Sequence, residues 1–159
     1  MSKLDKILEN ETFKSFIKDV EEIEKDRKFC RHGLEHLLSV ARIAYILNLR
    51  EDVGIRREVI YGAALLHDIG RYSEYEKEMP HAEAGAIIAE PILREAGYSD
   101  EETTSIVQAI KTHSRDNKGA EGLSELLSRA DRLSRSCFNC KAYDECNWSE
   151  EDKNMNVSF

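Results

Sequence analysis

The chain has 159 residues, 41% of them hydrophobic and 34% charged, with a formal net charge of −8 at pH 7. This size and composition are typical of one globular domain with a buried core. The negative charge argues against general binding of nucleic acids or anionic membrane surfaces, and no run approaches the roughly 18 apolar residues of a membrane span. The N-terminal residues lack the apolar core of a secretory signal. We therefore expect a cytoplasmic protein, whose four cysteines are thiols or metal ligands rather than disulfides.

The chain is predicted to be helical throughout, because apolar residues recur at helical spacing and no long segment alternates apolar and polar residues. The first helical region is interrupted near Asn10, and the third ends at Gly70 as at a C-terminal stop. Pro91 is expected to kink the fourth or to start a new turn, and Ser99 and Glu102 form a capping box that opens the fifth. The predicted helical regions cover residues 3–26, 34–49, 55–69, 81–96, 99–114 and 121–136.

The remaining segments have no helical period. Residues 71–80 form a polar stretch, residues 115–122 a loop, and the tail from residue 137 to residue 159 is expected to be irregular. We predict a single-domain, all-α bundle of about six helices with a buried metal site. The helical domain is expected to cover residues 1–136, with the cysteine-containing tail packed on the same domain.

Polar residues that can bind metals recur on helix faces that should be buried. His36 shares a face with Leu47, and Asp131 follows Leu127 by four residues. A buried aspartate without a partner costs several kcal/mol. One such histidine is more often a hydrogen-bonded core residue, but the recurrence on several helices favours a shared metal that satisfies them together.

The segment ALLHDIGRY, residues 64–72, places two strong metal ligands side by side at the end of an apolar run. Adjacent His67 and Asp68 point in different directions, so one can bind a first cation while the other bridges to a second. Gly70 is expected to let the chain turn sharply there. Histidine and carboxylate ligands suit Mn, Fe, Co, Ni or Zn better than Ca or Mg alone.

The order His36, His67–Asp68 and Asp131 resembles the HD-domain superfamily of metal-dependent phosphohydrolases. The resemblance covers about residues 30–135 and includes two further histidine segments, similar to those of binuclear members. The segments that carry it are HLLSVARIA (36–44), LLHDIGR (65–71), HAEAGAIIAEPIL (81–93), VQAIKTHS (107–114) and RADRLS (129–134).

The resemblance implies an all-α bundle with one or two divalent transition-metal ions (Mn, Fe, Co, Ni or Zn) buried between helices. The implied ligands of the first ion are His36, His67, Asp68 and Asp131, and those of the second are His81, His113 and the bridging Asp68.

The implied activity is hydrolysis of a nucleotide or another small phosphorylated metabolite by a metal-bridging hydroxide. Phosphomonoester, phosphodiester and pyrophosphate chemistry stay open, as do the substrate and the oligomeric state. No membrane partner and no general nucleic-acid binding are expected. The catalytic candidates are Asp68, His32, Arg71 and Lys111, with Arg31 and Arg115 as further basic groups.

Two of these candidates have a specific place in the resemblance. His32 resembles a histidine that lies beside the metal in some family members. Arg71 stands where many members have lysine, and it can still offer a bidentate donor to phosphate; the alternative is an exposed arginine at a helix end.

Two other functions are compatible with the same ligands. A minority of HD proteins use a mixed-valence di-iron site for oxygenase chemistry, and a non-catalytic metal-binding or signalling module is the third possibility. Complete ligand sets weigh against the last of these.

The cysteines fall outside the family motif. Cys30 precedes the helix that carries His36, and Cys137, Cys140 and Cys146 follow the helix that carries Asp131. If both helix ends lie beside one metal site, all four can form a second, structural site for zinc or an iron–sulfur cluster that would hold the tail to the bundle. The alternative is four reduced thiols without metal.

Overall fold

The computed structural model describes residues 1–76, 78–114 and 120–159, which form eight α-helices, two short 3₁₀ helices and no strand. The all-α prediction is confirmed. The helices are α1 (Lys3–Glu9), α2 (Glu11–Ile23), α3 (Leu34–Arg50), α4 (Arg57–Leu66), α5 (Arg71–Tyr75), α6 (His81–Ala96), α7 (Asp100–Thr112) and α8 (Gly122–Leu133), followed by η1 (Cys137–Asn139) and η2 (Tyr143–Glu145). None of the described helices is long and apolar enough to cross a membrane.

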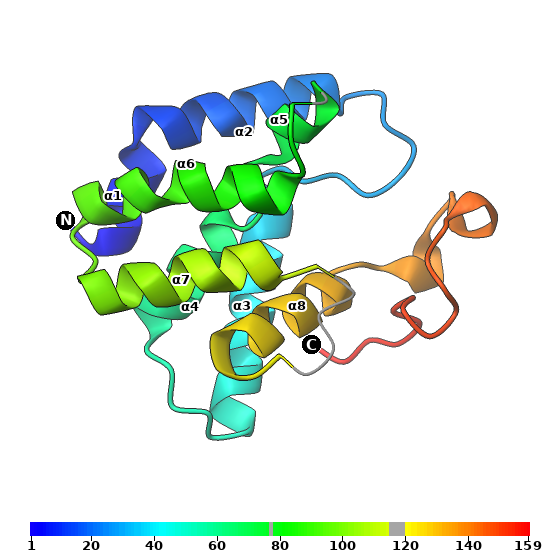
Figure 1. Ribbon diagram of the computed structural model, residues 1–159. Coiled ribbons are helices and arrows are strands. Elements are labelled where there is room, and N and C mark those ends of the chain that lie inside the picture. Colours follow the sequence, from blue (N-terminus) through cyan, green and yellow to red (C-terminus); the bar gives the residue numbers. More distant parts are fainter. Residues whose placement is uncertain (77, 115–119) are drawn as a thin grey trace.

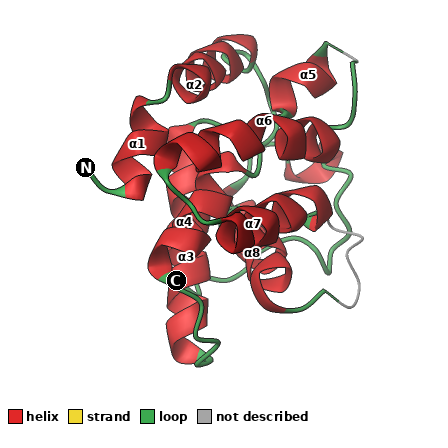
Figure 2. Cartoon of the chain, turned by 60° about the vertical axis from the view of Figure 1, so that its left-hand side comes forward, coloured by secondary structure: helices red, strands yellow, loops and turns green. Residues whose placement is uncertain are grey.

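The helices pack in two layers. α2, α6, α7 and α8 follow one another from top to bottom in Figures 1 and 2, and α3 runs across them. α6 packs on α7, and α3 packs on both α4 and α8. α4 is the central helix, because seven of its ten residues are buried. It therefore carries the residues that follow it, His67 and Asp68, into the interior of the bundle.

Helix caps explain several boundaries. Asn10 separates α1 from α2, because its side-chain oxygen accepts hydrogen bonds from the backbone N–H groups of Thr12 and Phe13 and so starts a new helix. The capping box predicted at the start of α7 is present: Ser99 Oγ accepts from the Glu102 N–H, and the Glu102 carboxylate accepts from the Ser99 N–H.

The structure differs from the sequence prediction mainly around residues 67–75 and at Pro91. α4 ends at Leu66, and a turn over residues 67–70 leads into α5, a helix within the segment 71–80 that is predicted only to be polar. α6 continues through Pro91, so no new helix starts there. Proline removes the hydrogen bond to the carbonyl four residues earlier, which belongs to Ile87, and this residue is 65% exposed, so water can replace the lost donor.

The tail is mostly irregular, as expected, apart from η1 and η2. It leaves the end of α8 and loops beside the bundle (Figure 1). Two hydrogen bonds from Asn154 Nδ2, to the carbonyls of Leu133 and Arg135, hold it against the end of α8.

Candidate metal centre

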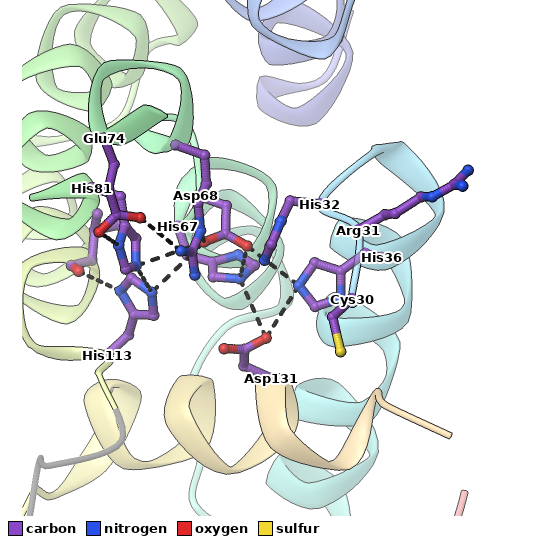
Figure 3. A network of polar contacts seen from close by, with 12 residues as sticks. Cys30, Arg31, His32, His36, His67, Asp68, Glu74, His81, His113 and Asp131 are labelled. Atoms are coloured by element: carbon purple, nitrogen blue, oxygen red, sulfur yellow. Dashed lines mark hydrogen bonds and ion pairs between the residues drawn. The ribbon is translucent and has the colours of Figure 1, made fainter. Parts of the chain in front are cut away.

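Five separate segments bring the predicted ligands together (Figure 3). The first turn of α3 supplies His36, and the turn after α4 supplies His67 and Asp68. The other three are His81 at the start of α6, His113 at the end of α7, and Asp131 near the end of α8. All six predicted ligands thus lie at one place in the fold.

The first group surrounds Oδ2 of Asp68. This oxygen lies 3.0 Å from Nε2 of His67 and 3.3 Å from Nε2 of His36. Oδ1 of Asp131 lies 3.1 Å from the same His36 nitrogen and 3.7 Å from that of His67. These four ligand atoms all lie within 4.8 Å of one another, close enough to hold a metal ion.

The second group surrounds Oδ1 of Asp68. Nε2 of His81 and Nε2 of His113 each lie 3.9 Å from this oxygen and 3.2 Å from one another. The three atoms again lie within 4.8 Å of one another. Each oxygen of one buried carboxylate therefore serves a different pair of imidazoles.

In each imidazole, the hydrogen-bond partner of Nδ1 indicates which ring nitrogen carries the proton. Nδ1 of His67 donates to the Ala64 carbonyl at 2.7 Å, and Nδ1 of His113 donates to the Ile110 carbonyl at 2.6 Å. Nδ1 of His81 donates to Glu74 at 3.1 Å. The remaining ring, of His36, has Nδ1 3.2 Å from the Ser134 hydroxyl. When neutral, all four rings consequently present the Nε2 lone pair to the centre, as metal-binding histidines do.

The polar atoms at the centre fit a cation. Nε2 of His67 and Oδ2 of Asp68 are buried without a hydrogen-bond partner, although they lie only 3.0 Å apart. The facing Nε2 atoms of His81 and His113 are likewise both acceptors when the rings are neutral. Acceptor atoms this close repel one another unless a positive charge lies between them. The donor set is the one that divalent transition metals prefer.

The pKa shifts of His67 and Asp68 also show that the centre stabilises positive charge. Burial lowers the pKa of His67, but the Asp68 and Asp131 carboxylates outweigh burial and raise that pKa to about 10. Burial raises the pKa of Asp68, but His67 and Arg71 outweigh it and hold that pKa well below the ordinary value. Burial and the neighbouring His67 lower the pKa of His113 to about 4, so this ring stays neutral and able to bind a metal.

His32 lies beside the ligands rather than among them. Its Nδ1 lies 2.5 Å from Oε1 of Glu24, whose Oε2 accepts from the His32 N–H at 2.7 Å. Tyr75 donates to the same Oε1 at 2.5 Å. The His32 ring lies 5.8 Å from the His36 ring, measured between ring centroids. Burial lowers the pKa of His32.

A cavity of about 670 Å³ opens onto the site. His32, His81, His113 and Asp131 form part of its lining, together with three arginines (Arg27, Arg71 and Arg135) and three further acidic residues (Glu74, Glu145 and Asp152). The arginines bring positive charge next to the acidic groups of this cavity, and the volume suits a small molecule.

Two of the cavity arginines contact the predicted ligands. Arg71 Nε donates to Asp68 Oδ1 at 3.1 Å, and its Nη1 donates to Glu74 at 2.8 Å, so this residue is not an isolated arginine at a helix end. Arg135 Nη2 lies 3.2 Å from His36 Nε2. Arg71 and Arg135 are thus placed next to the two ligand groups.

Other basic candidates are not brought to the cavity. Lys111 is exposed on α7 and does not line the cavity, because it precedes His113 by two residues and so faces the opposite side of the helix. Arg31 points away from the ligands (Figure 3) and donates to the Lys25 carbonyl. Arg115 lies outside the described residues.

Three residues at the site were not singled out in the sequence: Glu24, Glu74 and Arg135. Glu24 is the residue directly after α2, and no sequence motif marked it as a site residue. Glu74 lies three residues after Arg71, a spacing that a helix would place on one face, and Arg135 follows Asp131 by four residues. A helix prediction over residues 71–75 would have pointed to Glu74.

Comparison with known sequences gives three findings. A model of the HD domain matches residues 33–136. The chain is 43% identical to an uncharacterized protein of Clostridium beijerinckii over 159 residues, the full length of both. It is 36% identical over 103 residues to Ribonuclease Y of Enterococcus faecalis, which is 64% of this chain but only 18% of that protein.

Among solved structures, the crystal structure of a predicted HD superfamily hydrolase from an uncultured Thermotogales bacterium matches with a TM-score of 0.63 and 26% identity. The match covers 89% of this chain and 81% of that one.

Proposed function

This chain belongs to the HD-domain family, whose model matches most of its length, and on that premise we propose that it is a metal-dependent phosphohydrolase of nucleotides or other small phosphorylated metabolites. The similarity to a predicted HD superfamily hydrolase supports hydrolysis as the reaction class. The observation that carries the proposal is the sharing of Asp68 between two ligand groups beside a cavity whose lining includes three arginines.

We assign the first ion to His36, His67, Asp68 and Asp131, and the second to Asp68, His81 and His113. When bound, divalent ions would supply Lewis acidity, which lowers the pKa of water and offsets negative charge on phosphoryl oxygens. The roles of the surrounding residues follow from their own contacts.

Arg71 and Arg135 are proposed to bind the phosphoryl group. A guanidinium group donates in a planar fork that matches phosphate oxygens. Arg135 now contacts the Nε2 atom of His36, whose single lone pair cannot serve both a guanidinium and a cation. Binding of an ion through this nitrogen would therefore leave Arg135 free to donate to a substrate oxygen.

His32 is proposed to transfer a proton. Its Nδ1 is engaged by Glu24, so the other ring nitrogen is the one available in the cavity that the ring lines. The pKa lowered by burial keeps the ring neutral, and therefore able to accept a proton, near neutral pH.

The test is a turnover screen of the metal-loaded protein. Mn²⁺, Co²⁺, Ni²⁺ and Zn²⁺ are each tried with nucleoside mono-, di- and triphosphates, other phosphorylated metabolites and a short single-stranded RNA, the last because Ribonuclease Y is among the relatives. We expect hydrolysis of a small phosphorylated compound. Arg71→Gln should lower kcat/KM by roughly tenfold to a hundredfold, the value of a charged hydrogen bond, while Arg42→Gln, an exposed arginine on α3, should not.

Two outcomes would oppose the proposal. Oxygen uptake by the ferrous protein, without phosphate release from any compound, would indicate the di-iron oxygenase alternative. Full metal occupancy without turnover of any compound would indicate a binding module.

A further inference from the structure

The four cysteines meet at a second place, beside the cavity and separate from the histidine site. All of them line one small cavity of about 20 Å³. Cys140 N–H donates to the Cys137 carbonyl, and Cys146 N–H donates to the Tyr143 carbonyl, so two tight turns direct the tail cysteines. The other lining residues are Phe29, Tyr143, Trp148 and Lys153.

Contacts outside the cysteines hold the two segments together. Arg135 Nη1 donates to the Arg31 carbonyl at 2.7 Å, and Lys28 forms an ion pair with Glu145. Within the loop, Arg27 Nε donates to the Cys30 carbonyl at 2.8 Å. The loop that carries Cys30 and the segment that carries the other cysteines are thus joined by two contacts that involve no cysteine.

Burial of apolar side chains does not account for the ordered position of the tail, residues 137–159. Between residues 137 and 159 only Cys137 and Ala142 are buried. Tyr143 and Trp148 are partly buried, and three other apolar side chains are exposed: Phe138 at 45%, Val157 at 81% and Phe159 at 40%. Ordering a residue costs about 1–2 kcal/mol of backbone entropy, which apolar burial normally offsets. A segment with so little burial needs another source of order, and a metal cross-link is the usual one.

The spacing of the sulfurs distinguishes between metals. Four thiolates on one zinc ion, with Zn–S bonds of about 2.3 Å, lie about 3.8 Å apart and leave no space among them. Here, within the described residues, no three of the four sulfur atoms lie within 4.8 Å of one another, so they are spread more widely than the ligands of one zinc ion. This wider arrangement suits a cluster, whose irons each take one thiolate.

We propose that Cys30, Cys137, Cys140 and Cys146 bind an iron–sulfur cluster that fixes the tail to the loop before α3 and forms one wall of the substrate cavity. Cys30 and Cys146, with Phe29 and Trp148, line both the small cavity and the larger one. His32 follows Cys30 by two residues, so a cluster bound there also restrains the loop that carries His32. The proposal does not depend on the reaction catalysed at the histidine site.

The test is metal and sulfide analysis of the full chain purified without oxygen. We expect iron and acid-labile sulfide in equal amounts beyond any iron at the histidine site, with visible charge-transfer absorption that dithionite bleaches. Sulfide is the decisive readout, because the histidine site has no use for it. The double variant His67→Ala/Asp68→Ala should keep the sulfide, whereas Cys137→Ser/Cys140→Ser should lose it. Ser136→Ala, an exposed neighbour in the same turn, is the matched control and should keep it.

A second measurement covers the case in which the cysteine variant fails to fold. Native mass spectrometry of the unaltered chain should show the added mass of a cluster, and alkylation should leave all four thiols protected until the protein is denatured. One zinc ion per chain without sulfide would overturn the iron–sulfur assignment. Four thiols that react in the native protein, with no added mass, would overturn the site itself.

Discussion

Asp68 is the residue on which both ligand groups depend. Its Oδ2 faces His36 and His67, and its Oδ1 faces His81, His113 and Arg71. Asp68 is almost completely buried, with 1% of its surface exposed, so water cannot take the place of either carboxylate oxygen as a ligand. The other ligands each belong to one group only.

This difference predicts distinct effects on metal stoichiometry. Asp68→Asn removes the negative charge shared by both groups and should abolish tight binding of both ions, while His113→Ala should remove only the second. Titration calorimetry with Mn²⁺, together with metal analysis, measures the two stoichiometries. Retention of two ions by Asp68→Asn would refute the shared-ligand assignment.

Glu24 predicts a second effect, on stability against acid. Burial raises the pKa of Glu24, but hydrogen bonds from His32 and Tyr75 outweigh burial and lower that pKa from 4.5 to about 2. A lowered folded-state pKa stabilises the protein above the unfolded value, and this stabilisation is lost as the pH falls from about 4.5 to about 2. The shift corresponds to about 3 kcal/mol.

Denaturant unfolding from pH 7 to pH 2 measures this effect. Glu24→Gln should be less stable than the unaltered chain at pH 7, and the difference should shrink as the pH falls through this range. Glu21→Gln, an exposed neighbour, should follow the unaltered chain. If the free energy of unfolding changed with pH in the same way for Glu24→Gln and the unaltered chain, the assigned pKa would be contradicted.

Gly70 determines how closely the turn after α4 approaches the backbone of α6. The sequence suggested that it allows a sharp turn, but its φ of −84° is accessible to any residue. Its role is close approach: a Cβ at this position would lie 2.1 Å from the His81 carbonyl oxygen and 2.5 Å from the Gly85 nitrogen. The turn after α4 therefore touches the backbone of α6 directly, which sets the position of His81 against Asp68.

Gly70→Ala should accordingly push α6 away. We expect destabilisation of about 1–3 kcal/mol, typical of overpacking, together with weaker binding of the second ion. Thermal unfolding and Mn²⁺ titration measure the two effects. In Gly33→Ala, the matched control, the new Cβ meets only the flexible end of the exposed Glu21 side chain, so a much smaller change is expected. Equal effects of both substitutions would exclude the close-approach explanation.

The sequence predicted the long helices well because each buries a periodic apolar face. It failed at α5, since RYSEY has no apolar period and is only five residues long; this helix depends on its contacts with α6. It also placed Lys111 at the site on proximity to His113 alone, although helical phase points it away. Glu24 could not be found, because its role comes from segments that meet only in three dimensions, whereas the spacing of four residues between Asp131 and Arg135 was a signal that was missed.

At the scale of the whole molecule, bound metal should contribute to stability. The ligands join five segments, and ions that bind only the folded state stabilise it by about 2.7 kcal/mol at a concentration 100 times Kd. For a chain of this size that corresponds to a rise in Tm of roughly 5–10 °C. Scanning calorimetry with chelator and with added Mn²⁺ checks this. The Tm of Asp68→Asn should respond to neither, and an equal response in that variant would contradict the assigned ligands.

The spread of the ligands along the chain, from residue 36 on α3 to residue 131 on α8, has a kinetic consequence. No fragment that lacks either helix contains all four ligands of the first ion, and no local hairpin of helices assembles them. During refolding, tight capture of the first ion should therefore coincide with the last docking event among these helices. An added metal would then serve as a reporter of completed folding, while helical content recovers earlier.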